Sequence, residues 1–310
     1  MGSRTMMGGQ DRTIIGEHAT AAAALLTGAT VWGLIWYPYR LVETAGLGGI
    51  RSCVLTYAVA LGFALIAFQA TARSARFSWW LPLIALAACG CNLGYIMAVL
   101  RGEVMRVLLL FYLAPLWTVL LSRLLLGERL TRRGMPVILL SLAGAMVMLW
   151  HPARGMPWPG NTAEWIALGA GFSFALQNVL IRRASTLPIE LKSIAVLAGV
   201  VFFGLLLLPL ESGSGVSRLT SGDWLVLGLI GIVLLVVNLV VQYGLVRIVA
   251  NQASVIYLFE LVVAAASSWL LAGEAMGPRE WVGGSMIIAA SLFSGRLAVE
   301  SHQEDPRQPG

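Results

Sequence analysis

Residues 223–246 read DWLVLGLIGIVLLVVNLVVQYGLV, and this stretch decides the class of fold. Its first residue is charged, and the 23 that follow are uncharged and mostly apolar. A helix needs about 20 such residues to cross the hydrocarbon core of a bilayer. The stretch therefore predicts a transmembrane helix, and similar runs lie on both sides of it.

Ten apolar runs along the chain are candidates for membrane-spanning helices. They are residues 20–39, 50–71, 78–100, 104–126, 134–150, 163–182, 191–210, 223–246, 250–272 and 280–297. The first run lacks a clear cleavage signal, so we expect it to be retained as a helix. Because the connections are short, the sequence predicts an all-α polytopic membrane protein of ten transmembrane helices, without a soluble domain.

The composition excludes an ordinary soluble protein. Hydrophobic residues make up 58% of the chain and charged residues 12%, with a mean hydropathy of +0.81. A soluble domain carries about 25% charged residues. The net charge of +6 does not indicate nucleic-acid binding, because the cations stand singly or in pairs between apolar runs. Cys53, Cys89 and Cys91 lie inside such runs and favour helix contacts over metal binding.

The cations also predict an orientation. If the N-terminus is cytoplasmic, the inner segments hold 13 of the 21 Lys and Arg residues, the outer segments hold 7, and Arg123 lies within a helix. Cytoplasmic segments are enriched in these residues. We therefore expect cytoplasmic tails at 1–19 and 298–310, and an external loop at 151–162.

The two halves of the chain resemble each other. At an offset of 146 residues, Asn92 matches Asn238, Arg101 matches Arg247, and Gly127-Glu128 matches Gly273-Glu274. At an offset of 142 residues, Trp32 matches Phe174, Trp36 matches Asn178, and Arg40 matches Arg182. The offsets divide the chain into two five-helix repeats, residues 20–150 and 163–297.

Five helices are an odd number, so the second repeat enters the membrane from the opposite side. Inverted repeats around a central site are a structural basis of alternating access. Gly127-Glu128 and Gly273-Glu274 lie at helix ends, and we interpret them as turn and packing elements rather than substrate sites.

Residues 110–130, LFYLAPLWTVLLSRLLLGERL, resemble the repeat signature of the drug/metabolite transporter superfamily, EamA type. The second copy runs from Tyr257 to Glu274, and Trp32-Gly33 also fits the family pattern. This resemblance implies ten helices, cytoplasmic termini and movement of metabolites, often outward. The chain is most similar to bacterial aromatic amino acid exporters, which implies the bacterial inner (plasma) membrane and a small-molecule substrate. Exporters of nucleosides or cationic drugs are the alternative.

The sequence departs from the family at one place. The family often has Glu-Pro in the ninth helix, whereas Glu260 is followed here by Leu261. A straighter ninth helix, or an altered site, is the expected consequence.

Polar and aromatic residues inside the apolar runs are the candidates for substrate binding. They are Trp32, Trp36, Asn92, Tyr95, Tyr112, Pro115, Asn178, Asn238, Gln242, Tyr257 and Glu260. The aromatic residues suit stacking on an aromatic or cationic substrate. In the family, the proline that matches Pro115 belongs to the pore-lining helix.

Two interpretations stay open for the polar candidates. Glu260 has long apolar stretches on both sides, so lipid burial favours its neutral form. It either senses protons and pairs with a substrate ammonium, or it hydrogen-bonds to a neighbouring helix. Asn92, Asn238 and Gln242 either bind substrate or join helices. Gly28, Gly33, Gly169 and Gly171 are expected to allow close helix approach.

Functions other than transport have less support. His18, His151 and His302 all lie outside the apolar runs, and HExxH, Gly-x-Ser-x-Gly and Walker motifs are not found. A channel would more often show charged rings or a filter loop. The sequence therefore predicts neither an enzyme nor a cofactor or metal site, and it gives no sign of a protein partner. It favours a secondary transporter driven by a gradient.

Overall fold

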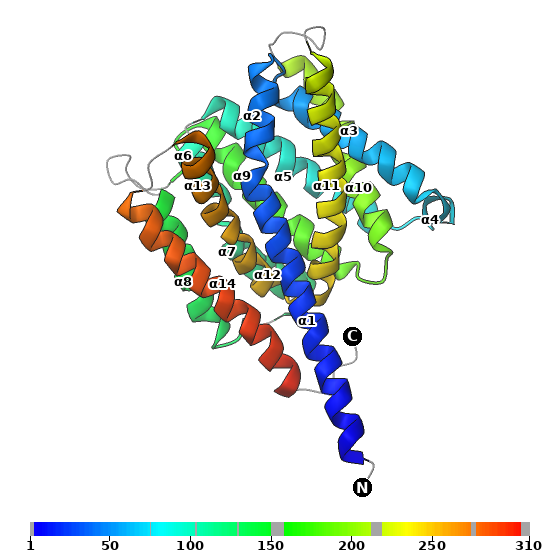
Figure 1. Cartoon of the computed structure of the whole chain (residues 1–310), viewed down its shortest axis with the longest axis vertical. Coiled ribbons are helices and arrows are strands. Elements are labelled where there is room, and N and C mark those ends of the chain that lie inside the picture. The colour runs from blue at the N-terminus through cyan, green and yellow to red at the C-terminus, as the bar shows by residue number, and fades with distance from the viewer. Residues whose placement is uncertain are drawn as a thin grey trace.

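The computed structural model describes residues 3–74, 76–102, 104–128, 130–149, 158–211, 219–273 and 277–304. Every regular element within these ranges is a helix, as the sequence predicts. The helices stand side by side in one bundle, and both the start of α1 and the end of α14 lie at the lower end of Figure 1. Most of the expected loop at 151–162, and Glu274, lie outside the described residues.

The helices follow one another through short connections. Their bounds are α1 Ser3–Leu34, α2 Trp36–Thr44, α3 Gly49–Ala67, α4 Gln69–Ser74, α5 Trp80–Arg101, α6 Val104–Phe111, α7 Ala114–Leu125, α8 Gly134–Leu149, α9 Thr162–Arg183, α10 Ile189–Leu207, α11 Ser221–Arg247, α12 Ala250–Tyr257, α13 Phe259–Ala272 and α14 Pro278–Glu304. A short 3₁₀ turn, η2 at Leu208–Leu210, ends α10.

Eight helical segments among the described residues are long and apolar enough to cross a membrane. They are Gly16–Thr44, Gly49–Ala67, Trp80–Val99, Val107–Leu125, Thr162–Arg183, Ile189–Leu207, Ser221–Arg247 and Ala250–Leu271. The protein is therefore an all-helical, polytopic membrane protein. The other two expected spans fall on α8, which has only 16 residues, and on α14. Ten spans remain a prediction.

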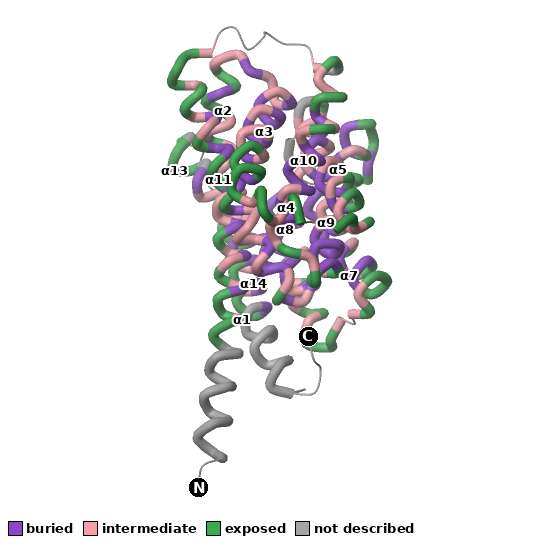
Figure 2. The backbone as a smooth tube through the Cα atoms, turned by 90° about the vertical axis from the view of Figure 1, so that its right-hand side faces the viewer, coloured by how far each residue is buried: buried purple, intermediate pink, exposed green. Residues whose placement is uncertain are grey.

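Large apolar side chains are exposed on the outer faces of the helices. Leu206 is 62% exposed, Leu225 66% and Leu270 70%. Figure 2 shows exposed residues on the outer sides and ends of the helices, with buried residues between them. A water-facing surface of this kind would be unfavourable, but a lipid-facing one is expected because hydrocarbon replaces water as the solvent.

The helices of the two halves pack against each other in matching pairs. α5 lies along α9, and α11 lies along α1. Likewise, α3 packs against both α10 and α11, while α10 packs against α5. α8 and α14 pair with each other beside the rest of the bundle (Figure 1). If each helix is replaced by its counterpart in the other half, the α5–α9 contact becomes the α11–α1 contact. In the same way, the α3–α11 contact becomes the α10–α5 contact.

Two spans are interrupted at equivalent positions. α6 ends at Phe111 and α7 begins at Ala114, so Tyr112 and Leu113 interrupt the fourth predicted span. Leu258 separates α12 from α13, and it lies 146 residues after Tyr112. Pro115 accounts for the first break, because a proline lacks the N–H and clashes with the carbonyl four residues earlier.

The ninth predicted span breaks without a proline. Leu261 stands where the first half has Pro115, and its N–H donates to the Leu258 carbonyl at 3.1 Å. The ninth span is therefore interrupted as well, by one residue where the fourth is interrupted by two, and a straighter ninth helix stays a prediction. Because the same interruption forms with and without proline, tertiary packing rather than proline chemistry must hold it in the second half.

Three of the four glycines expected at close helix contacts do lie at them. A methyl group at Gly28 would come within 2.3 Å of a neighbouring side chain, and one at Gly33 within 2.7 Å. At Gly171 the methyl group would lie 2.4 Å from the backbone oxygen of Phe111. The expectation is wrong for Gly169, where no atom lies within 4 Å, because this face of α9 has no closely packed neighbour.

The two Gly-Glu elements begin with the same backbone turn. Gly127 and Gly273 have φ of 71° and 68°, a left-handed conformation that glycine adopts without strain. The N–H groups of Leu126 and Glu128 both donate to the Ser122 carbonyl, which closes the end of α7. The predicted turn is confirmed at Gly127-Glu128.

Candidate functional site

Five aromatic rings meet in the interior of the bundle. Tyr95 comes from α5, Phe111 from α6, Tyr112 from the break after α6, Phe174 from α9 and Tyr257 from α12. The centroid of the Phe111 ring lies 5.1 Å from that of Tyr95, 5.3 Å from that of Tyr112 and 5.6 Å from that of Phe174. The rings of Phe174 and Tyr257 are 5.1 Å apart. We call these five residues the aromatic cluster.

Glu260 lies against the aromatic cluster. It stands in the first turn of α13, directly after the break at Leu258, where the helix dipole favours a negative charge. The Tyr112 hydroxyl donates a hydrogen bond to its carboxylate. Tyr95 and Tyr257 lie within electrostatic reach of the same carboxylate. Glu260 as a whole residue is half-buried.

Tyr257 offers a second polar group at this place. Its side chain is 3% exposed, and its hydroxyl has no hydrogen-bond partner among the described residues. A buried hydroxyl without a partner is unfavourable unless a ligand or water satisfies it. The site thus combines apolar ring faces with a carboxylate and an unused hydroxyl, which suits a small organic molecule that bears an amino group.

The structure brings four of the predicted residues together, namely Tyr95, Tyr112, Tyr257 and Glu260. Pro115 is buried one residue into α7, where it shapes the break that presents Tyr112. The breaks in both spans therefore contribute directly to the site, because they place Tyr112 and Glu260 at half-helix ends.

The two tryptophans and Asn178 lie nearby. The Trp36 indole N–H donates to Ser267 Oγ at 2.9 Å, about two turns along α13 from Glu260. Trp32 packs against the core that contains Tyr257. Asn178 is buried in α9 one turn after Phe174, and therefore shares a helix face with it.

The remaining polar candidates join helices. The Tyr57 hydroxyl donates to Asn92 Oδ1 at 2.7 Å, which links α3 to α5. Gln242 Nε2 donates to Ser193 Oγ at 2.9 Å and to Asn238 Oδ1 at 2.6 Å, which links α11 to α10. These contacts satisfy the helix-joining interpretation, and the structure does not place Asn92, Asn238 or Gln242 in the aromatic cluster.

Two residues of the aromatic cluster were not among the sequence candidates. Phe111 precedes Tyr112 in residues 110–130, the stretch that resembles the family signature. Phe174 is the counterpart of Trp32 at the 142-residue offset. Both signals were present in the sequence. However, an aromatic residue in an apolar run is also typical of simple packing, so the sequence gave no reason to select them.

The described residues do not gather three or more His, Cys, Asp or Glu side chains in a group that could hold a metal ion.

Comparison with known proteins agrees with this fold. Residues 161–296 match the model of the EamA-like transporter family. Residues 161–296 therefore carry an EamA-like transporter domain, which is consistent with the EamA-type resemblance at residues 110–130. This assignment makes it a membrane protein of a transporter family.

Several relatives extend the similarity over most of the chain. Protein RarD of Streptomyces exfoliatus is 27% identical over 280 residues, which cover 85% of this chain and 84% of the relative. A probable terminal-alkyne amino-acid exporter of Streptantibioticus cattleyicolor is 26% identical over 92% of this chain and 96% of the relative. An uncharacterized transporter of Archaeoglobus fulgidus is 27% identical over 65% of this chain.

A solved crystal structure has the same fold. It superposes with a TM-score of 0.74 and covers 90% of this chain and 98% of its own, at 20% sequence identity. At this identity the likeness concerns the fold alone.

Proposed function

We propose that the protein is a secondary transporter that exports aromatic or other neutral amino acids by alternating access. The observation that carries this proposal is the contact between Glu260 and Tyr112 beside the aromatic cluster. A carboxylate pairs with the ammonium group of an amino acid, and ring faces accept both cations and aromatic side chains. Cationic drugs would use the same groups and are the second candidate.

The inverted repeat supplies the transport mechanism in this proposal. Ten spans arranged as two antiparallel five-helix repeats account for the matching helix pairs and for the equivalent breaks. The site lies at these breaks, at half-helix ends, as substrate sites of many transporters do. Each repeat then adopts the conformation of the other, and access to Glu260 changes sides.

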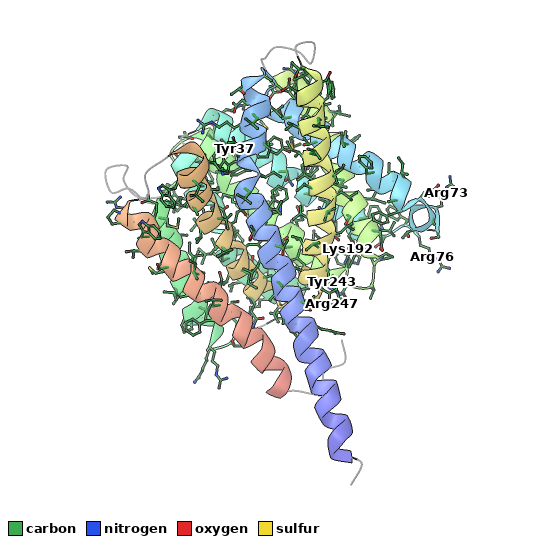
Figure 3. The ribbon with its side chains drawn as sticks, in the orientation of Figure 1. Tyr37, Arg73, Arg76, Lys192, Tyr243 and Arg247 are labelled. Carbon is green, nitrogen blue, oxygen red and sulfur yellow. The ribbon has the colours of Figure 1, made fainter. Side chains whose placement is uncertain are left out.

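The proposed orientation places both termini in the cytoplasm of a bacterial cell. α1 begins and α14 ends at the same end of the bundle (Figure 1). Lys192 and Arg247 lie near the end of α11, while Arg73 in α4 and Arg76 just after it extend outward (Figure 3). These cations belong to segments that the positive-inside rule assigns to the cytoplasm.

The printed name of one relative supports the substrate class. The Streptantibioticus cattleyicolor protein is named a probable terminal-alkyne amino-acid exporter, and the similarity covers 96% of that protein. An apolar amino acid of this kind would fit the same combination of carboxylate and apolar surface.

Uptake into proteoliposomes tests the proposal. Purified protein should move labelled phenylalanine, tyrosine or leucine faster than empty vesicles at two pH values, with uridine and a quaternary ammonium dye tested alongside. Glu260→Gln should slow amino acid uptake about tenfold or more, because a charge-assisted hydrogen bond to the substrate is lost. Glu43→Gln, an exposed carboxylate in α2, is the matched control and should transport normally.

Two results would count against the proposal. If no compound of the panel crosses faster than in empty vesicles, the transporter function is wrong. If Glu260→Gln leaves both the rate and its pH dependence unchanged, Glu260 is a structural residue and the substrate site lies elsewhere.

A further inference from the structure

Glu128 forms a polar junction at the end of the bundle near the chain termini. Its carboxylate pairs with the Arg182 guanidinium through Nε, and its other oxygen accepts the Ala250 N–H at 3.0 Å. Glu128 follows α7, Arg182 lies in the last turn of α9 and Ala250 begins α12. One side chain of the Gly-Glu element therefore connects three helices, which goes beyond the turn and packing role that the sequence suggested.

Arg182 extends the junction to a fourth helix. Its Nη1 donates to the Leu245 and Val246 carbonyls, at 3.4 and 3.1 Å. These carbonyls belong to the last turn of α11, which lacks further intrahelical donors. Arginine side chains stabilise such helix ends by hydrogen bonding and by interaction with the dipole.

A second contact joins α7 directly to α12. Ser122 Oγ donates to Asn251 Oδ1 at 3.2 Å, and both side chains are buried, at 0% and 4% exposure. The Glu128–Arg182–Ala250 contacts and this Ser122–Asn251 bond together are called the Glu128 junction below. α7 and α12 also pack against each other along their lengths.

Both half-helices run from the Glu128 junction to the candidate substrate site. α7 begins at Ala114, directly after Tyr112 and Leu113, and ends next to Glu128. α12 begins at Ala250 and ends at Tyr257, three residues before Glu260. A half-helix is a rigid rod over this distance, so the contacts at one end fix where the other end lies.

We propose that Glu128 and Arg182 are positioning residues that close the terminus-side entrance to the site and set the rate of transport. This inference rests on the proposed transport function. While the Glu128 junction is intact, α7 and α12 stay together, and Tyr112 and Tyr257 keep their places beside Glu260. For the site to open toward this end, the two half-helices must separate, and the contacts of Glu128 must break.

The opposite end of the molecule differs in this structure. Arg40, the counterpart of Arg182 at the 142-residue offset, is exposed, whereas the Arg182 side chain is 20% exposed and paired. The counterpart of Glu128 is Glu274, which lies outside the described residues.

Cysteine accessibility tests the inference without any substrate. Thr118 is buried on α7, one turn from Ser122 toward the site, and its hydroxyl bonds only within its own helix. In the full-length chain in membrane vesicles, a membrane-impermeant maleimide should label Thr118→Cys slowly. Adding Glu128→Gln should raise the labelling rate from the terminus side about tenfold, the factor expected for losing a hydrogen bond between charged groups.

A matched carboxylate at the other end of the bundle provides the control. Glu211 accepts the backbone N–H groups of Ile50 and Arg51 at 2.7 and 3.1 Å, in the same way that Glu128 accepts Ala250. Glu211→Gln should leave the labelling of Thr118→Cys unchanged. Arg182→Gln should raise it as Glu128→Gln does, and the double variant should raise it no further, because both remove one contact.

The outcomes separate the two proposals. An unchanged labelling rate in Glu128→Gln overturns the role of the junction, even if the protein transports amino acids. A raised rate in a protein that transports nothing supports the junction and rejects the amino acid exporter. If Glu128→Gln does not fold, Glu128→Asp and Arg182→Lys are measured by the same criterion. In transport assays, Glu128→Gln should change turnover while KM stays within about twofold, since Glu128 does not touch the site.

Discussion

At the scale of single residues, the contact between α9 and the end of α6 has the most direct effect on the site. Gly171 brings the α9 backbone against Phe111, and this approach lets the Phe174 ring contact the Phe111 ring. A side chain at this position has no free space, because its first carbon would meet a backbone oxygen that cannot rotate away. The aromatic cluster therefore depends on a residue that contributes no ring.

Gly171→Ala should consequently disturb both stability and transport. Inserting a methyl group against a fixed backbone costs about 1–3 kcal/mol. We expect a loss of that size in the free energy of unfolding, together with a raised KM, because Phe111 and Phe174 are pushed apart. Thermal unfolding in detergent and proteoliposome uptake measure the two effects.

Gly169→Ala is the matched control for this prediction. It lies in the same helix, two residues earlier, and a methyl group there meets no atom within 4 Å. Since alanine favours a helix over glycine by about 0.5–1 kcal/mol, this variant should be neutral or slightly more stable. Equal losses from both substitutions would show that the close approach at Gly171 does not matter.

At the scale of helices, the two interrupted spans decide which polar groups reach the candidate site. The break after Phe111 carries Pro115 in the following helix, whereas the break at Leu258 is followed by Leu261. Both breaks present a side chain to the aromatic cluster, Tyr112 in one case and Glu260 in the other. The geometry of the break, rather than the identity of the residue after it, is the shared feature.

Leu261→Pro should therefore be tolerated. The Leu261 N–H makes a single 3.1 Å bond to the Leu258 carbonyl in the tight turn, so proline loses no regular α-helical bond there. We expect the variant to fold, with a loss of about 1 kcal/mol in the free energy of unfolding at most, and to keep measurable transport.

Ala265→Pro tests the same substitution one turn further along. Position 265 lies in the interior of α13, where proline removes a helical bond and clashes with the preceding turn at a cost of about 3 kcal/mol or more. Expression, unfolding and uptake of the two variants should differ clearly. If Leu261→Pro is as damaging as Ala265→Pro, the two breaks are not equivalent.

At the scale of the whole molecule, the proposed mechanism requires the two halves to lie antiparallel in the bilayer. The matching helix pairs and equivalent breaks are the contacts that such an arrangement requires. The exposed apolar faces indicate that lipid surrounds the bundle. Because both halves expose such faces, the faces do not indicate how each half is oriented across the membrane.

Sided labelling should place the two Gly-Glu turns on opposite sides of the membrane. Arg132, after the first turn, and Arg279, after the second, are both exposed. In oriented vesicles, an impermeant maleimide should label Arg132→Cys from the cytoplasmic side and Arg279→Cys from the external side. Labelling of both from one side would contradict the inverted repeat and the alternating-access mechanism.

The individual residues of the site were predicted unevenly from the sequence. Tyr95, Tyr112, Tyr257 and Glu260 were found because each is a polar group inside an apolar run, which is costly and therefore informative. Phe111 and Phe174 carry no such cost and could not be told from packing residues. Asn92 and Gln242 share the cost, but both hydrogen-bond to neighbouring helices away from the site.

The sequence by itself determined the solvent, the helical class and the family pattern, because a chain with 12% charged residues and long apolar runs cannot cover a water-facing surface. Only the tertiary structure decided which rings surround Glu260, that the ninth span breaks without a proline, and that Glu128 joins three helices. These features depend on how helices far apart in the chain cross one another. Side-chain periodicity within one helix specifies a face, but it does not specify which residues of another helix meet that face.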